Sequence, residues 1–213
     1  VAVFKPQSAF FETYGAAGIA VLERLLADIA GSGALSILDV KRGDIGSTMD
    51  AYADAYLREG APLAADAITL SPYLGFGSLK PAFDRAVAND RGVYVLARTS
   101  NPEGGRVQLA LAQEGSVVQK IIDTATEANR LLPTKAIGLV IGGTHADLGC
   151  DVSEFNGSIL VPGIGAQGGR LEDLPDLFGD AVRHVLPAVG RGVAGAGPAP
   201  DALRRRVAEL LAG

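Results

Sequence analysis

Two carboxylates and an amine gather in a short stretch of this sequence. Asp39 and Lys41 flank Val40 at the end of an apolar run, and Asp44 follows in a glycine-flanked turn. Side chains alternate between two faces along a strand, so Asp39 and Lys41 are expected on the same face. Because ionised groups are costly to bury and gather at reactive sites, this arrangement indicates electrostatic or acid–base catalysis. A structural ion pair at the end of a strand is the simpler alternative.

A second set of residues is suited to binding an anion. The segment 162–169 (PGIGAQGG) is rich in glycine and contains Gln167, and Gly190 with Arg191 follows the next apolar run. The backbone amides of such a loop can approach a phosphate closely, and a guanidinium is a permanently charged fork. Glycines that only form turns are the alternative. Together the two segments predict a phosphate site.

Short apolar runs alternate with longer helical patterns, and these elements must position the reactive residues. The expected strands are Ala2–Phe4, Leu35–Val40, Ala67–Leu70, Val93–Leu96, Ile137–Ile141, Ser158–Val161 and Val182–Leu186. The expected helices are Ala16–Ile29, Thr48–Leu57, Leu79–Ala88, Ser116–Leu132, Leu171–Phe178 and Pro200–Leu211. Strand and helix alternation of this kind is typical of a parallel α/β architecture.

The polar residues favour a barrel over a doubly wound sheet, because they follow the ends of many different strands. They are Lys5, Asp39, Ser100, Gln167 and Arg191. No GxGxxG sequence opens a helix, so a dinucleotide fold has no support. Seven strand–helix units are recognisable, and the sequence begins inside an apolar run. We therefore expect a (β/α)8 TIM barrel that lacks its first strand, in a single domain over residues 1–213.

The composition excludes several classes of protein. The chain has 213 residues, 48% of them hydrophobic, and a net charge of -5, which argues against a nucleic-acid-binding surface. No apolar segment reaches the roughly 18 residues that cross a membrane. The single cysteine, Cys150, cannot form an internal disulfide, and neither His145 nor His184 has partners at metal-ligand spacing. A cytoplasmic protein without a metal site is expected.

The segment from Asp39 to Ile45 matches the pattern DxKxxDI, and by it the chain resembles the orotidine 5′-phosphate decarboxylase family. The resemblance extends over essentially the whole chain, through residues 4–7, 71–75, 99–104 and 162–169. It implies decarboxylation of orotidine 5′-monophosphate to uridine 5′-monophosphate without metal or cofactor. The family's first strand, which carries an aspartate that contacts the ribose, has no counterpart here.

The resemblance also implies roles for individual residues. Lys5, Asp39, Lys41 and Asp44 would form an alternating charged array, in which Lys41 stabilises a carbanion at C6 of the pyrimidine and then protonates it. Asp44, Ile45 and Thr48 would reach the neighbouring site of a homodimer. The substrate would be held by Ser100 at the pyrimidine edge, with Thr99 as its competitor, and by Gln167, Gly190 and Arg191 at the phosphate. The turn 101–105 would form part of a lid.

Two other functions remain open at this point. Sugar-phosphate decarboxylases and aldolases of the same barrel group also carry DxKxxD, but they use Mg²⁺ held by acidic residues. Here Lys5 stands where such a residue would be needed, and its charge would repel the cation. A noncatalytic barrel that binds nucleotide phosphates is the second alternative.

Overall fold

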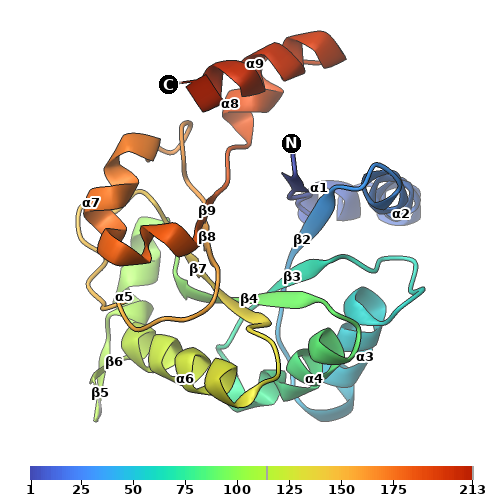
Figure 1. Ribbon diagram of the computed structural model, residues 1–213. Coiled ribbons are helices and arrows are strands. Elements are labelled where there is room, and N and C mark those ends of the chain that lie inside the picture. Colours follow the sequence, from blue (N-terminus) through green and yellow to red (C-terminus); the bar gives the residue numbers. More distant parts are fainter. Residues whose placement is uncertain (114, 213) are drawn as a thin grey trace.

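The structure, a computed structural model, describes residues 1–113 and 115–212. Within these residues, seven parallel strands form one sheet in the order β1-β2-β3-β4-β7-β8-β9. Their bounds are β1 Val3–Phe4, β2 Leu35–Arg42, β3 Ala67–Leu70, β4 Gly92–Arg98, β7 Ile137–Ile141, β8 Ile159–Val161 and β9 Val185–Pro187. The sheet is curled, and Figure 1 shows a gap between β1 and β9. The arrangement is that of an α/β barrel that is not closed.

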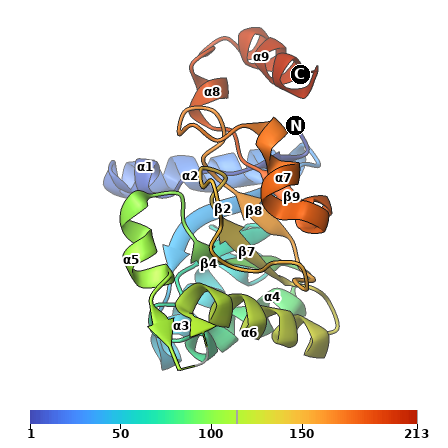
Figure 2. The ribbon, with the colours of Figure 1, turned by 90° about the vertical axis from the view of Figure 1, so that its left-hand side faces the viewer.

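Helices surround the outside of the curl (Figure 1). The α-helices of the described residues are α1 Ala9–Glu12, α2 Gly15–Gly31, α3 Gly46–Leu57, α4 Lys80–Ala88, α5 Gly105–Gln108, α6 Val117–Leu131, α7 Leu174–Phe178, α8 Arg191–Ala194 and α9 Pro200–Ala212. Short 3₁₀ helices lie at Phe76–Leu79, Pro102–Gly104, Leu171–Asp173 and Gly179–His184, and β5 Leu111–Ala112 pairs with β6 Gly115–Ser116 as a hairpin. Helices α8 and α9 lie at the end of the molecule opposite α3, α4 and α6 (Figure 2).

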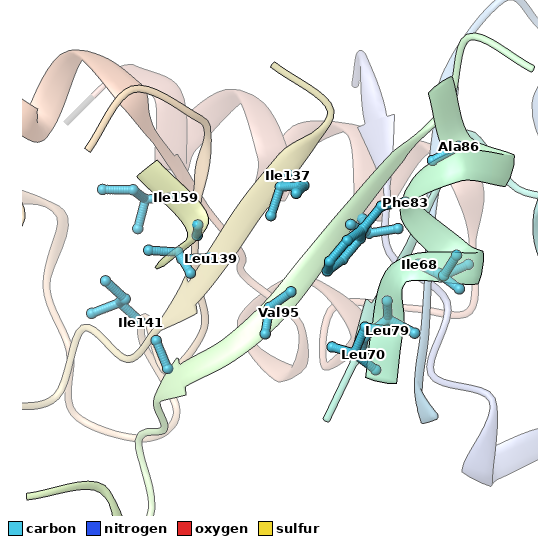
Figure 3. Close-up of a cluster of buried hydrophobic side chains, with 14 of the residues drawn as sticks. Ile68, Leu70, Leu79, Phe83, Ala86, Val95, Ile137, Leu139, Ile141 and Ile159 are labelled. Carbon is cyan, nitrogen blue, oxygen red and sulfur yellow. The ribbon is translucent and has the colours of Figure 1, made fainter. Parts of the chain in front are cut away.

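The core follows the alternation of the strands. One set of strand residues packs outward against the helices, and Ile68, Val95 and Leu139 belong to the same buried cluster as Phe83 of α4 (Figure 3). The intervening positions fill the inside of the curl with the cluster Ile37, Ala67, Tyr94, Val140 and Leu160. Both faces of the strands are therefore buried, as expected for parallel strands covered by helices. Asp39 lies two residues after Ile37 and Thr69 two residues after Ala67, so both follow the inward-facing positions of their strands. Both lie towards the carboxyl ends of those strands.

Most of the expected strands and helices are present within a few residues of their predicted bounds. The strand predicted at Val182–Leu186 is wrong in its first half, because residues 182–184 belong to the 3₁₀ helix Gly179–His184. Ala181 is buried there and Val182 packs against the core, so these apolar residues are buried without joining the sheet. The predicted helix Leu171–Phe178 is a 3₁₀ turn followed by α7.

Two further predictions concern the chain as a whole. In the described part of the chain, no helix is long and apolar enough to cross a membrane. The prediction of a single domain over residues 1–213 remains a prediction, and its last residue, Gly213, lies outside the described residues.

Candidate active site

Three of the predicted site residues form a chain of ion pairs at the carboxyl ends of β1 and β2. Lys5 Nζ donates a hydrogen bond to Asp39 Oδ2 at 2.9 Å, and Lys41 Nζ donates to Asp39 Oδ1 at 2.5 Å. The Asp39 side chain is 10% exposed, whereas that of Lys41 is 43% exposed. A buried carboxylate thus holds two ammonium groups, one of which faces the solvent.

Backbone pairing beyond β1 places Lys5 beside Asp39. The amide of Asp39 donates to the Pro6 carbonyl at 2.9 Å, and the amide of Ser8 donates to the Asp39 carbonyl at 3.2 Å. The segment after β1 therefore continues alongside β2, and Lys5 arrives at the level of the Asp39 carboxylate. This pairing fixes the spacing between two residues that lie far apart in the sequence.

Lys41 is presented by an irregularity in β2 rather than by simple alternation. Leu38 pairs with Ile68 and Arg42 pairs with Leu70, so β2 advances four residues while β3 advances two. Within this bulge Lys41 adopts a φ of 46°, a left-handed conformation that non-glycine residues seldom adopt. Asp39 and Lys41 do meet as predicted, but a strained backbone brings them together.

The two lysines determine the charge state of Asp39. Burial alone would raise the pKa of the Asp39 carboxyl, but the charges and hydrogen bonds of Lys5 and Lys41 outweigh that effect and hold the pKa below its usual value. The carboxylate is therefore ionised near neutral pH. In return its two oxygens fix the positions of both ammonium groups.

Thr69 belongs to this site, although the sequence patterns did not single it out. Its hydroxyl donates to Asp39 Oδ1 at 2.9 Å and accepts from the backbone amide of Lys41 at 2.9 Å. The residue is 1% exposed and lies near the carboxyl end of β3. The signal that could have revealed it is a single hydroxyl in the otherwise apolar strand Ala67–Leu70.

Asp44, Ile45 and Thr48 lie where β2 passes into α3. Asp44 Oδ1 accepts a hydrogen bond from the backbone amide of Ile45 at 2.8 Å, and the side chains of Ile45 and Thr48 are exposed. Among the described residues of this chain, no ion pair joins Asp44 to Lys5 or Lys41. The structure of one chain therefore brings Lys5, Asp39 and Lys41 together but leaves Asp44 outside the array.

The loops after β4 and β8 meet through two other predicted residues. Ser100 Oγ donates to Gln167 Oε1 at 2.9 Å, so residues that are 67 apart in the sequence are in direct contact. Hydrogen bonds between glycines shape the β8 loop: the amide of Gly165 donates to the Gly169 carbonyl at 2.8 Å, and that of Gly168 to the Gly165 carbonyl at 2.8 Å. The hydrogen bond between Ser100 and Gln167 therefore joins the residue expected at the pyrimidine to a residue expected at the phosphate.

Gly190 lies between β9 and α8, Arg191 begins α8, and β9 is the strand next to β8. Arg191 is the first residue of α8 and is exposed. No hydrogen bond or ion pair connects its guanidinium to any other residue that the structure describes. An unpaired guanidinium on a loop next to the glycine-rich loop is available for an anionic ligand.

The expected lid segment, 101–105, is made of the 3₁₀ helix Pro102–Gly104 and the start of α5. It is held at its base by Gln108, which accepts from the Thr99 amide at 3.0 Å and donates to Thr99 Oγ at 2.7 Å. His145 also contacts this base, with Nε2 3.0 Å from the Thr99 carbonyl. The amide, hydroxyl and carbonyl of Thr99 are thus all hydrogen-bonded within the loop. Ser100 is therefore the better placed of the two residues to contact a ligand.

The other titratable groups can be compared with the arrangements that bind metals. Among the described residues, no group of three or more His, Cys, Asp and Glu side chains is arranged to hold a metal ion. Burial raises the pKa of the Cys150 thiol to about 11, so this cysteine is a packing residue rather than a nucleophile.

Comparison with known proteins shows the family of the chain. The sequence model of the Orotidine 5'-phosphate decarboxylase / HUMPS family matches residues 1–206. The chain belongs to this family. Its curated relatives include the orotidine 5'-phosphate decarboxylases of Salinispora arenicola, 51% identical over all of this chain and 77% of the relative, and of Streptomyces coelicolor, 52% identical over 96% of this chain and 74% of the relative. The relatives are longer than this chain.

Solved structures of the family share the fold. A crystal structure from Streptomyces avermitilis superposes with a TM-score of 0.93 at 51% identity and covers all of this chain and 76% of that chain. The OMP decarboxylase of Leishmania donovani gives a TM-score of 0.74 at 32% identity, over 99% of this chain and 80% of that chain. The expected TIM-barrel class is therefore confirmed.

Proposed function

We propose that this chain decarboxylates orotidine 5′-monophosphate to uridine 5′-monophosphate and CO2, and so acts in pyrimidine nucleotide synthesis. The observation that carries the proposal is the array of Lys5, Asp39 and Lys41. It supplies a fixed ammonium at the carboxyl ends of the strands. The chain is also 51% and 52% identical to two curated orotidine 5'-phosphate decarboxylases. An array of two lysines around one carboxylate also carries a net positive charge, which suits an anionic substrate.

The chemistry requires a cation close to the pyrimidine ring. When the bond between C6 and the carboxylate breaks, the electron pair stays on C6 in the plane of the ring, where the π system cannot delocalise it. In our proposal the Lys41 ammonium stabilises this pair by its charge and then transfers a proton to C6. Solvent returns the proton to Lys41 after the product leaves.

Asp39 and Lys5 prepare the ammonium before the substrate arrives. Asp39 fixes the position of the Lys41 ammonium through one carboxylate oxygen, while Lys5 holds the other. Charges that are already oriented need no reorganisation during the reaction, which is the main source of electrostatic catalysis. We assign Lys5 and Asp39 to this preorganisation.

The remaining predicted residues would bind the substrate. Gln167, Gly190 and Arg191 form the proposed phosphate site, and Ser100 reads the pyrimidine edge. The contact between Ser100 and Gln167 supports a single continuous site. Binding energy from the phosphate would then help to close the lid over the ring and exclude water.

We also propose that the active unit is a homodimer that acts in the cytoplasm. Asp44, Ile45 and Thr48 would complete the site of the partner subunit. This proposal is supported by the exposed position of Ile45, at 63%, and by the lack of an ion pair between Asp44 and the array in the described part of its own chain.

The deciding experiment measures CO2 release from orotidine 5′-monophosphate by the wild type and by Lys41→Ala, with and without a chelator. We expect Lys41→Ala to lose activity by at least about a thousandfold, since it removes both the charge and the proton donor. Lys80→Ala is a matched control, because Lys80 is an exposed lysine paired with Asp84 on α4. The wild type and the control should be equally active, and the chelator should change neither.

Two results would contradict the proposal. Activity lost on chelation would favour the Mg²⁺-dependent sugar-phosphate enzymes of the same barrel group. Tight binding of uridine 5′-monophosphate without any release of CO2 by the wild type would favour a noncatalytic nucleotide-binding barrel.

A further inference from the structure

The hydroxyl of Thr69 lies between the two residues that define the site. It donates to Asp39 Oδ1 and accepts from the Lys41 backbone amide, both at 2.9 Å. A threonine hydroxyl has one proton to donate and lone pairs to accept with, so it can make both bonds at once. A residue that only packed against its neighbours would need neither bond.

The bond to Asp39 falls on the oxygen that also holds Lys41. Lys41 Nζ and Thr69 Oγ both donate to Oδ1, while Lys5 Nζ donates to Oδ2. The position of Oδ1 therefore decides where the Lys41 ammonium lies. Because Thr69 is buried within β3, it fixes that oxygen relative to the sheet.

The bond to the Lys41 amide acts on the strained part of β2. The bulge takes Lys41 out of the regular pairing between β2 and β3, and its φ of 46° is unfavourable for a side chain with a Cβ. A buried amide without a partner would add to that cost. The Thr69 hydroxyl supplies the missing partner, so it supports the backbone conformation from which the Lys41 side chain extends.

We propose that Thr69 is a positioning residue for the decarboxylation: its hydroxyl fixes both the Asp39 carboxylate and the backbone of Lys41. The inference rests on the proposed function, because it assigns Thr69 to the same reaction. It predicts that loss of the hydroxyl weakens the chemical step while leaving the binding of the phosphate group intact.

The test compares Thr69→Val, which keeps the shape of the side chain but removes the hydroxyl, with Thr69→Ser, which keeps the hydroxyl. We expect Thr69→Val to lower kcat by about tenfold to hundredfold, as for the loss of a hydrogen bond to a charged group. KM should change by less than about threefold, because the phosphate residues lie on other loops. Thr69→Ser should restore most of kcat.

Thr126→Val is the matched control. Thr126 is also buried, and its hydroxyl donates to the Ile122 carbonyl within α6, away from the array. This variant should keep the kcat and KM of the wild type. A structural effect of losing any buried hydroxyl would lower the activity of both valine variants.

A measurement without turnover separates this inference from the proposed function. Loss of the Thr69 donor should raise the pKa of the Asp39 carboxyl, which NMR of labelled aspartate can follow in the folded protein. If the wild type released no CO2, the proposed function would fail while a raised Asp39 pKa in Thr69→Val would still support the positioning role. An unchanged pKa, or a kcat in Thr69→Val equal to that of the wild type, would overturn the inference.

Discussion

Asp39 accepts hydrogen bonds from Lys5, Lys41 and Thr69, and each comes from a different segment of the chain. A carboxylate has about four positions that can accept a proton donor, so this one is nearly saturated. A side chain held by three donors has little rotational freedom. The ammonium of Lys41 is therefore placed by a group that is itself fixed.

This arrangement makes the stability of the fold depend on pH. The pKa of Asp39 is lower in the folded chain than in the unfolded chain, so its contribution to stability is present above the unfolded pKa of about 4 and is lost as the pH falls through the folded pKa. Asp39→Asn should therefore destabilise the protein most near pH 7, and the difference in free energy of unfolding should shrink below about pH 4. Urea unfolding of both proteins across this range measures it. A difference that stays constant down to pH 2 would contradict the ionised, doubly paired Asp39.

Among the elements, the end of β2 is sterically constrained close to the proposed site. Gly43 lies so close to Ser71, which follows β3, that a Cβ at position 43 would collide with the Ser71 carbonyl oxygen. The amide of Ser71 in turn donates to the Arg42 carbonyl at 2.7 Å. The bulge that presents Lys41 is thus closed by a contact that only glycine permits.

Gly43→Ala should destabilise the protein by about 1–3 kcal/mol, as for other substitutions that overfill a packed site. It should also lower activity, because the backbone beside Lys41 has to shift. Gly77→Ala is the control, since a Cβ on Gly77 meets no atom nearby and its φ is not positive. Thermal unfolding and CO2 release together decide the point, and equal effects at the two glycines would refute the steric explanation.

The regular elements could be predicted from the sequence because their apolar runs end at polar residues or glycines. Ala67–Leu70 and Ile137–Ile141 have the predicted bounds. Helices of four residues, such as α1, α5 and α8, are too short to show a period. Only residues 182–184 of the strand predicted at 182–186 were assigned wrongly, because apolar residues in a 3₁₀ turn that packs against the core resemble those of a strand.

The site could be predicted in part for a similar reason. Charged residues at strand ends pointed to Lys5, Asp39 and Lys41, and the structure joins them. The bulge at Lys41 could not be foreseen, since it depends on the register with β3. Thr69 was missed because a single threonine in a strand also fits ordinary strand composition. In our proposal Asp44 acts in the site of a second chain, and one sequence does not define that contact.

At the scale of the whole molecule, the proposed site draws on loops from Lys5 to Arg191. The residues follow strands β1, β2, β4, β8 and β9, which span the sheet. The array lies on one half of the curl and the proposed phosphate site on the other. The curvature of the complete sheet therefore sets the distance between the catalytic and the binding groups.

The proposed dimer can be tested by mixing two inactive variants. Lys41→Ala lacks the ammonium, and Asp44→Asn lacks the carboxylate that we assign to the partner site. A hybrid dimer contains one site with an intact Lys41 and an intact Asp44 from the other subunit. Because about half of the dimers are hybrids after random exchange, and half of their sites are complete, CO2 release should recover to about a quarter of the wild-type value.

Each variant alone should remain inactive under the same conditions. A mixture that stays inactive although mass spectrometry shows exchanged subunits would mean that Asp44 acts within its own chain or not at all. Analytical ultracentrifugation of the unmixed proteins would show whether either substitution prevents association.

The two edge strands of the curled sheet, β1 and β9, differ in how readily they could pair with a strand of another molecule. β9 ends in Pro187, which has no amide hydrogen to offer to an incoming strand, whereas β1 has its hydrogen-bonding groups beside the exposed apolar side chains of Phe4 and Leu35. For the described residues, association through a sheet edge is therefore expected at β1 rather than at β9. A charged residue at position 35, which lies at the start of β2 and away from the array, would then reduce this association.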